Sequence, residues 1–74
     1  MLVKYNIREI DTIIPTKCTI TVEDFSGECF PCLYTPIFDD GDHVERKDST
    51  LMKHIDGDKW QVVNRKTLKY FYYQ

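Results

Sequence analysis

The sequence has no long apolar run and no strong excess of charge of either sign. No segment approaches the roughly 18 consecutive apolar residues of a membrane-spanning helix, and in MLVKYNIREI charges begin before any signal-peptide core. Ten Lys and Arg against twelve Asp and Glu give a net charge of −2, which disfavours a protein that neutralises duplex DNA. We therefore expect a cytoplasmic protein with no membrane partner, for which nucleic acid is a disfavoured ligand.

Glycine, proline and cysteine are also scarce, with three of each among 74 residues. So few glycines and prolines beside 42% hydrophobic residues exclude a disordered chain. An odd number of cysteines cannot form a closed disulfide framework, so we expect reduced thiols. A chain this short forms one domain, residues 1–74, and buries only ~60% of its unfolded surface. Little room remains for a catalytic cleft, and we predict that the protein is not an enzyme.

The N-terminal segment carries signals of both a strand and a helix. Residues 2–7 alternate as a strand does, with every second side chain apolar. From Ile7 onward, isoleucines follow helical spacing, with Asn6 placed as an N-cap and Pro15 as a stop. The pattern predicts a short helix or helical turn over residues 7–14.

Residues 18–34 predict a β-hairpin, because two alternating runs flank the turn residues Ser26 and Gly27. With these two residues as the loop, Asp24 lies opposite Cys29. The side of the hairpin expected to face the core then consists of Cys18, Ile20, Val22, Cys29, Pro31 and Leu33.

An Asp56-Gly57 turn between apolar runs predicts a second hairpin, over residues 51–63. In that register the inward face consists of Leu51, Ile55, Trp60 and Val62. A turn at residues 64–67 then returns the chain as a last strand that places Phe71 opposite Trp60.

These elements predict a mainly β fold of about five short strands. Two arrangements fit them, a small SH3-like barrel and a bent antiparallel sheet, each with room for one short N-terminal helix. An α+β sheet is the alternative.

The segment Cys29-Phe30-Pro31-Cys32 has the spacing of a metal or redox motif. Together with Cys18 and His43 these cysteines supply enough ligands for a tetrahedral zinc site, which stays as an alternative. A redox thiolate needs a helix after its first cysteine, and the following residues do not predict one. In a strand, residues three apart point to opposite faces with Cα atoms about 10 Å apart, beyond the roughly 7 Å of a disulfide. We therefore favour two separate thiols and no cofactor.

The C-terminal strand carries the most promising surface. Residues 65–73, RKTLKYFYY, combine three positive charges with four aromatic rings. Both a protein interface and a single-stranded nucleic-acid platform use this combination. Alternation places Tyr70 and Tyr72 on the outward face beside Gln61, unless the N-terminal segment covers the tyrosines as a second small core.

We therefore expect a non-enzymatic interaction module that binds another protein or its own copy. It would act as an accessory or inhibitory factor, such as those of mobile elements. The expected contact residues are Gln61, Arg65, Lys69, Tyr70 and Tyr72, with Tyr72 as the central anchor. A zinc-stabilised module and a single-stranded nucleic-acid binding module are the alternatives.

Overall fold

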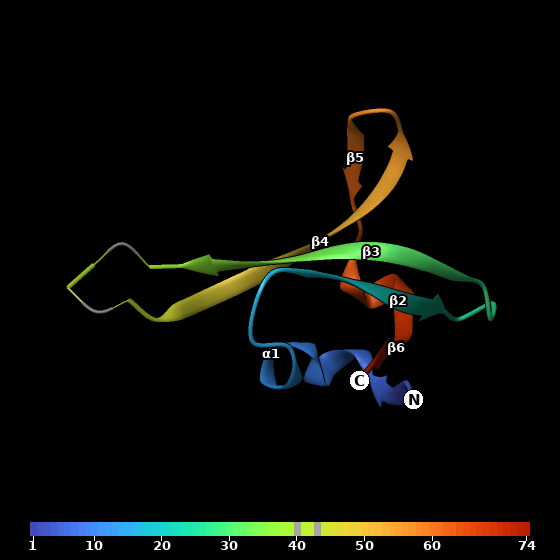
Figure 1. The fold of residues 1–74 in the computed structure, drawn as a ribbon, viewed down its shortest axis with the longest axis horizontal. Helices are drawn as coiled ribbons and strands as arrows, with labels where there is room; N and C mark the ends of the chain where they lie inside the picture. Colours follow the sequence, from blue (N-terminus) through green and yellow to red (C-terminus); the bar gives the residue numbers. More distant parts are fainter. Residues whose placement is uncertain (40, 43) are drawn as a thin grey trace.

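A computed structural model describes residues 1–39, 41–42 and 44–74. They form one antiparallel sheet of six strands in the order β1-β6-β2-β3-β4-β5 (Figure 1). The strands are β1 (Val3–Asn6), β2 (Cys18–Asp24), β3 (Cys29–Phe38), β4 (Arg46–Asp56), β5 (Lys59–Val62) and β6 (Leu68–Tyr73). The helical elements are the 3-10 turns η1 (Ile7–Glu9) and η2 (Arg65–Thr67) and the helix α1 (Ile10–Ile13). Within the described ranges, no helix has the length and apolar character needed to cross a membrane.

The sheet is bent and does not close into a barrel. Its edges are β1 and β5, and in the described part of the chain these two strands do not pair. β4 curves along its length, so that the β4–β5 hairpin stands away from the rest of the sheet (Figure 1). The predicted mainly β fold is confirmed in its bent-sheet form.

Both signals in the N-terminal segment are confirmed. β1 ends at Asn6, whose side chain accepts a hydrogen bond from the backbone N–H of Arg8 and so begins η1. The helical segment then buries Ile7, Ile10 and Ile14 against one face of the sheet.

The core lies between this helical segment and the sheet. Its members are Ile7, Ile10, Ile14, Ile20, Val22, Cys32, Tyr34, Leu51, Leu68 and Phe71. They come from both ends of the sequence and from four central strands, so the core depends on long-range pairing.

The first hairpin pairs one residue out of the predicted register. Glu23, and not Asp24, lies opposite Cys29. The loop holds three residues, because the Asp24 N–H donates to the Glu28 carbonyl oxygen across residues 25–27. Gly27 closes this loop at φ +90°, a conformation that a side chain disfavours.

This shift reverses the two faces of β3. Cys32 and Tyr34 are buried, whereas Cys29 and Pro31 are exposed and Leu33 is half-buried on the outer face. The prediction that Cys29, Pro31 and Leu33 face the core is therefore wrong, since a slip of one residue moves every side chain to the other side.

The second hairpin also departs from the predicted register. His54 lies opposite Trp60, and a bulge follows between His54 and Asp56. The Trp60 and Val62 side chains are 42% and 66% exposed, and Ile55 is exposed as well. Of the predicted inward face only Leu51 is buried, because no layer formed by the described residues covers the projecting β4–β5 hairpin.

The last strand pairs with β1 and β2, not with β5. η2 occupies the predicted turn and carries the chain away from β5 to the opposite half of the sheet. The predicted pairing of Phe71 with Trp60 is therefore wrong. Phe71 lies opposite Val22, and its ring stacks on Tyr5 with ring centroids 5.4 Å apart.

β3 and β4 extend beyond the body as a two-stranded projection (Figure 1). We call its outer part, residues 37–39, 41–42 and 44–46, the arm. The Asp39 N–H donates to the Glu45 carbonyl oxygen, which joins its two sides. The zinc alternative includes His43, which lies outside the described residues.

Candidate functional site

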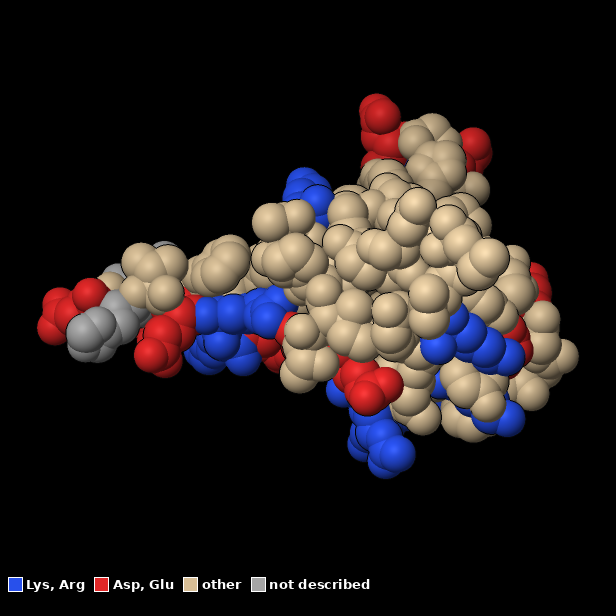
Figure 2. All heavy atoms as spheres, turned by 60° about the horizontal axis from the view of Figure 1, so that its bottom comes forward, with Lys and Arg blue, Asp and Glu red and all other residues tan. Residues whose placement is uncertain are grey.

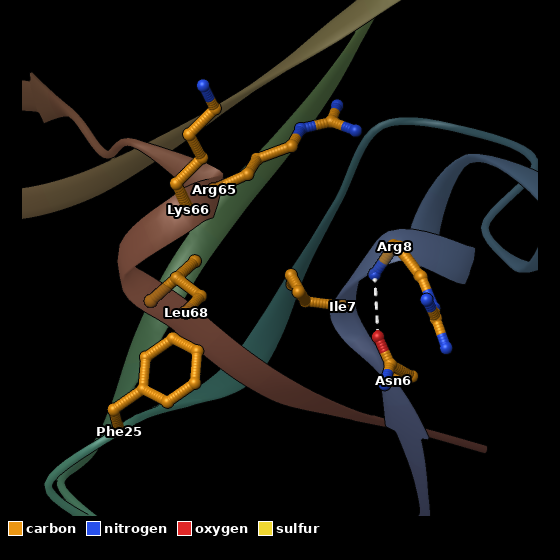
Figure 3. Close-up of a pocket in the computed structure, with 7 residues that line it drawn as sticks. All are labelled: Asn6, Ile7, Arg8, Phe25, Arg65, Lys66 and Leu68. Carbon is orange, nitrogen blue, oxygen red and sulfur yellow. Dashed lines mark hydrogen bonds between the residues drawn. The ribbon is translucent and has the colours of Figure 1, made fainter.

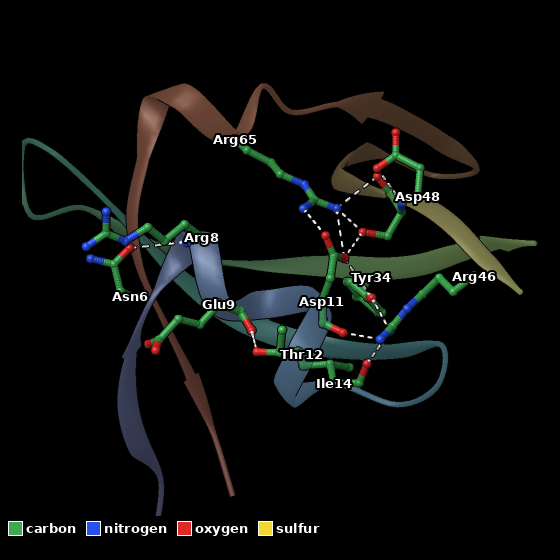
Figure 4. Close-up of polar contacts among 11 residues, drawn as sticks. Asn6, Arg8, Glu9, Asp11, Thr12, Ile14, Tyr34, Arg46, Asp48 and Arg65 are labelled. Atoms are coloured by element: carbon green, nitrogen blue, oxygen red, sulfur yellow. Dashed lines mark hydrogen bonds and ion pairs between the residues drawn. The ribbon is translucent and has the colours of Figure 1, made fainter.

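Arg65, one of the predicted contact residues, is held by a polar network that the sequence did not indicate. Its Nη1 lies 2.6 Å from Asp11 Oδ2, and its Nη2 donates to the Ser49 carbonyl oxygen at 2.9 Å (Figure 4). Asp11 stands on α1 and Ser49 on β4, so the guanidinium joins segments far apart in the chain. Its charge is engaged inside the fold rather than offered to a partner.

Asp11 is the centre of this network. Besides Arg65, its carboxylate accepts hydrogen bonds from the Tyr34 hydroxyl at 2.9 Å and from the Ser49 hydroxyl. Burial acts to raise the pKa of Asp11, but hydrogen bonds from Ser49 and Arg65 outweigh it and lower the pKa below its ordinary value. Arg46 closes the network, because its Nη1 donates to the Tyr34 hydroxyl and to the Ile14 carbonyl oxygen.

The predicted tyrosines lie together on the sheet face opposite Phe71. Both are half-buried, because β1 extends the sheet beside them: Lys4 pairs with Tyr72 and Asn6 with Tyr70. The Lys4 ammonium lies 4.0 Å from the centroid of the Tyr70 ring. The N-terminal segment therefore flanks the tyrosines as a neighbouring strand.

The Tyr72 hydroxyl donates to Glu23 Oε1 at 2.5 Å. This hydrogen bond, with the nearby charge of Glu23, raises the pKa of the Tyr72 hydroxyl to about 12. Tyr72, the predicted anchor, thus already has an internal partner. Gln61 stands exposed on β5, opposite Lys53, at the far end of the strand order from these tyrosines.

An open groove lies between η1, η2 and the β2–β3 turn, with a volume of about 620 Å³ (Figure 3). Its lining consists of Asn6, Ile7, Arg8, Phe25, Arg65, Lys66 and Leu68. The buried Ile7 and Leu68 form an apolar floor, and the Phe25 side chain, 68% exposed, stands at one wall. We call this hollow the basic groove.

Two similar turns place the cations of the basic groove. Asn6 Oδ1 accepts from the Arg8 N–H at 3.2 Å, and Asn64 Oδ1 accepts from the Lys66 N–H at 2.9 Å. An asparagine that binds the backbone two residues later favours such a turn. Each turn therefore sets a cation on its own side of the groove (Figure 3). The repeated pattern Asn-x-Arg/Lys was the sequence signal for this site, but only folding reveals that its two copies line the same groove.

The charged ends at the rim of the basic groove are available to a ligand. Within the described ranges, neither Arg8 nor Lys66 forms an ion pair, whereas Arg65 pairs with Asp11 and Lys4 with Glu23. Lys69 extends the positive rim, since its ammonium lies 6.0 Å from the Phe25 ring centroid and 5.3 Å from that of Tyr70. The arrangement suits an anionic group at the rim and an apolar group on the floor.

The cysteines lie apart from this groove. Cys29 is exposed and Cys32 fully buried, on opposite faces of β3, as the spacing predicted. Burial raises the pKa of the Cys32 thiol to about 11, and partial desolvation with the nearby charge of Glu23 raises the pKa of the Cys29 thiol. Burial raises the pKa of the Cys18 thiol too. Among residues 1–39, 41–42 and 44–74, no three His, Cys, Asp or Glu side chains are placed to share a metal ion.

Comparison with known proteins bears on none of these features. The chain matches no family model, no curated protein and no solved structure.

Proposed function

We propose that the chain is a non-enzymatic interaction module whose basic groove binds a protein segment with acidic and apolar side chains. One observation carries this proposal: Arg8 and Lys66, both free of ion pairs in the described part of the chain, flank the apolar floor of Ile7 and Leu68. Acidic side chains pair with the rim cations, and an apolar side chain covers the floor.

The predicted contact surface and the basic groove adjoin one another. Lys69 lies near both the Phe25 ring, which lines the groove, and the Tyr70 ring on the sheet face. Arg65 contributes the stem of its side chain to the lining, while its charge is bound to Asp11. The proposed contact therefore extends from the groove to Tyr70 and Tyr72 and leaves out Gln61.

A protein ligand is favoured over single-stranded nucleic acid for two reasons. The net charge of −2 opposes the approach of a polyanion. The Tyr70 ring already has the Lys4 and Lys69 ammonium groups near it, which compete with a stacked base.

Selection from a random peptide display library tests the proposal. We expect the wild-type protein to enrich peptides that combine Asp or Glu with apolar residues. The variant Arg8→Glu/Lys66→Glu should lose these peptides, because it reverses both rim charges. The control Lys17→Glu/Lys59→Glu makes the same change in net charge at exposed residues outside the groove and should retain them. Selected peptides that bind both double variants equally would exclude the groove as the binding site.

The nucleic-acid alternative has its own test. Titration with a fluorescent oligothymidine at low salt should show no binding under the protein proposal. The alternative predicts an affinity that falls steeply with salt and is lost in Tyr72→Ala. That result would identify this surface as a binding site for single-stranded nucleic acid.

A further inference from the structure

The arm presents apolar side chains that nothing in the described fold covers. Ile37, Phe38 and Val44 are 41%, 49% and 79% exposed. A small domain gains no stability from apolar side chains left in water, and contiguous exposed apolar groups commonly mark a contact surface. The arm is therefore a second surface that needs a partner, separate from the basic groove.

Charge distinguishes the arm from the groove. Asp39, Asp42 and Glu45 give the outer part of the arm a negative charge, and Figure 2 shows acidic side chains at its far end. Lys47 lies outside the arm, and the Arg46 guanidinium turns back to bind Ile14 and Tyr34. The arm thus pairs acidic with apolar side chains, which is the chemistry that the basic groove is proposed to bind.

We propose that the basic groove of one copy of this chain receives the arm of a second copy. This inference rests on the proposed function and names the partner. Arg8 and Lys66 pair with acidic side chains of the arm, while Phe38 or Val44 covers the floor of Ile7 and Leu68. The arm of the same molecule projects away from the β2–β3 turn that forms one wall of the groove, so the occupant comes from another copy (Figure 1).

Pairing of two arms with each other is the competing arrangement, and like charges oppose it. Arm and groove are different surfaces, so their contact is head-to-tail, and such contacts build open chains or closed rings. The average mass in solution should therefore rise with protein concentration. It should fall with added salt, because the contact is partly between exposed charges.

Analytical ultracentrifugation of three forms of the full chain tests this inference. The groove variant is Arg8→Glu/Lys66→Glu, and the arm variant is Asp42→Lys/Glu45→Lys. Asp39 is left intact because its side chain accepts from the Gly41 N–H within the arm. Alone, each variant should self-associate at least about tenfold more weakly than the wild type. In each variant the groove and the arm carry charges of the same sign, which repel. Mixed together they should associate again, because the intact arm of one meets the intact groove of the other and the two reversed surfaces are also opposite in charge.

Matched controls change charge at exposed residues elsewhere. Lys17→Glu/Lys59→Glu and Glu28→Lys/Asp58→Lys should associate as the wild type does, and circular dichroism should show every variant folded. A wild type that stays monomeric at all concentrations would overturn the inference. Self-association that survives in both the groove and the arm variants would overturn it equally. If the groove still selects acidic peptides in either case, the proposed function stands and only the identity of the partner fails.

Discussion

At the scale of single residues, Asp11 carries an unusual share of the tertiary contacts. Its carboxylate accepts hydrogen bonds from β3 through Tyr34, from β4 through Ser49 and from η2 through Arg65. The helix that bears it has only four residues and cannot be stable alone. Asp11 therefore helps to fix this short helix on the sheet.

Replacing Asp11 by Asn should lower the free energy of unfolding at neutral pH by roughly 1 kcal/mol. The ion pair with Arg65 is partly exposed, which limits its value. The pKa of Asp11 is lowered in the folded state, so its contribution is present above the unfolded pKa of about 3.9 and is lost as pH falls through the folded value.

Urea denaturation across the acidic range measures both effects. The free energy of unfolding of the wild type should decline below a pH of about 4. In Asp11→Asn this decline should be smaller, because the variant has no carboxylate at residue 11 to protonate. Asp58→Asn, at an exposed turn position, is the control and should match the wild type. Parallel curves for Asp11→Asn and the wild type would contradict this role.

The cysteines should differ in reactivity within one strand. The exposed Cys29 should be alkylated in the folded protein, whereas Cys32 should react only on unfolding. Burial and a pKa of about 11 leave the Cys32 thiol protonated at neutral pH. Mass spectrometry after timed alkylation gives the order in which the cysteines react. Early modification of Cys32 would argue against its place in the core.

At the scale of elements, loops decide which face of a strand meets the core. In the β2–β3 loop, Asp24 Oδ1 accepts from the N–H groups of Ser26 and Glu28, and Gly27 adopts φ +90°. A three-residue loop of this kind sets the register by which Cys32 and Tyr34 are buried.

Gly27→Ala should destabilise the fold by about 1–2 kcal/mol, because a side chain is strained at this φ. No atom of the described residues lies within 4 Å of the new methyl group, so the cost is conformational. Gly41→Ala is the control, since the Asp39 side chain, at 3.6 Å, is an ordinary contact for the added methyl group, and we expect a change within about 0.5 kcal/mol. Thermal denaturation of both variants measures the difference, and equal effects would dismiss the conformational explanation.

At the scale of the whole molecule, one small core supports a sheet with two free ends. The β4–β5 hairpin and the arm both leave the body, and of the core members named above only Leu51 comes from these parts. The stability of the chain is therefore concentrated where β2, β3 and β6 pack against the helical segment.

Phe71→Ala should abolish folding, whereas Trp60→Ala should cost less than about 1 kcal/mol. Deleting a buried phenylalanine costs roughly 3–5 kcal/mol, about the total stability that a core of this size supplies. Phe71 is fully buried on β6, while Trp60 is 42% exposed on the edge strand β5. Dispersion of amide resonances in NMR spectra distinguishes a folded from an unfolded variant. An unfolded Trp60→Ala would instead support the pairing of Phe71 with Trp60 that was predicted from the sequence.

The sequence by itself determined the local elements of this protein. Alternation located the strands around residues 18–34 and 51–73, and Asn6 and Pro15 bounded the helical segment. It also separated Cys29 from Cys32 and set Tyr70 and Tyr72 on the face opposite Phe71. These features depend on neighbouring residues, whose side-chain direction follows from backbone geometry alone.

Only the tertiary structure decided register, strand order and the basic groove. The Gly27 loop shifted the pairing of the first hairpin by one residue. In the second hairpin, a turn at Gly57 and Asp58 together with the bulge after His54 gives the same net shift beyond the bulge, and alternation alone cannot detect either. β6 pairs with β1 and β2 and not with β5, because pairing there buries Leu68 and Phe71 in the core. The groove unites residues 6–8, 25 and 65–68, and nothing in a local pattern brings such distant segments together.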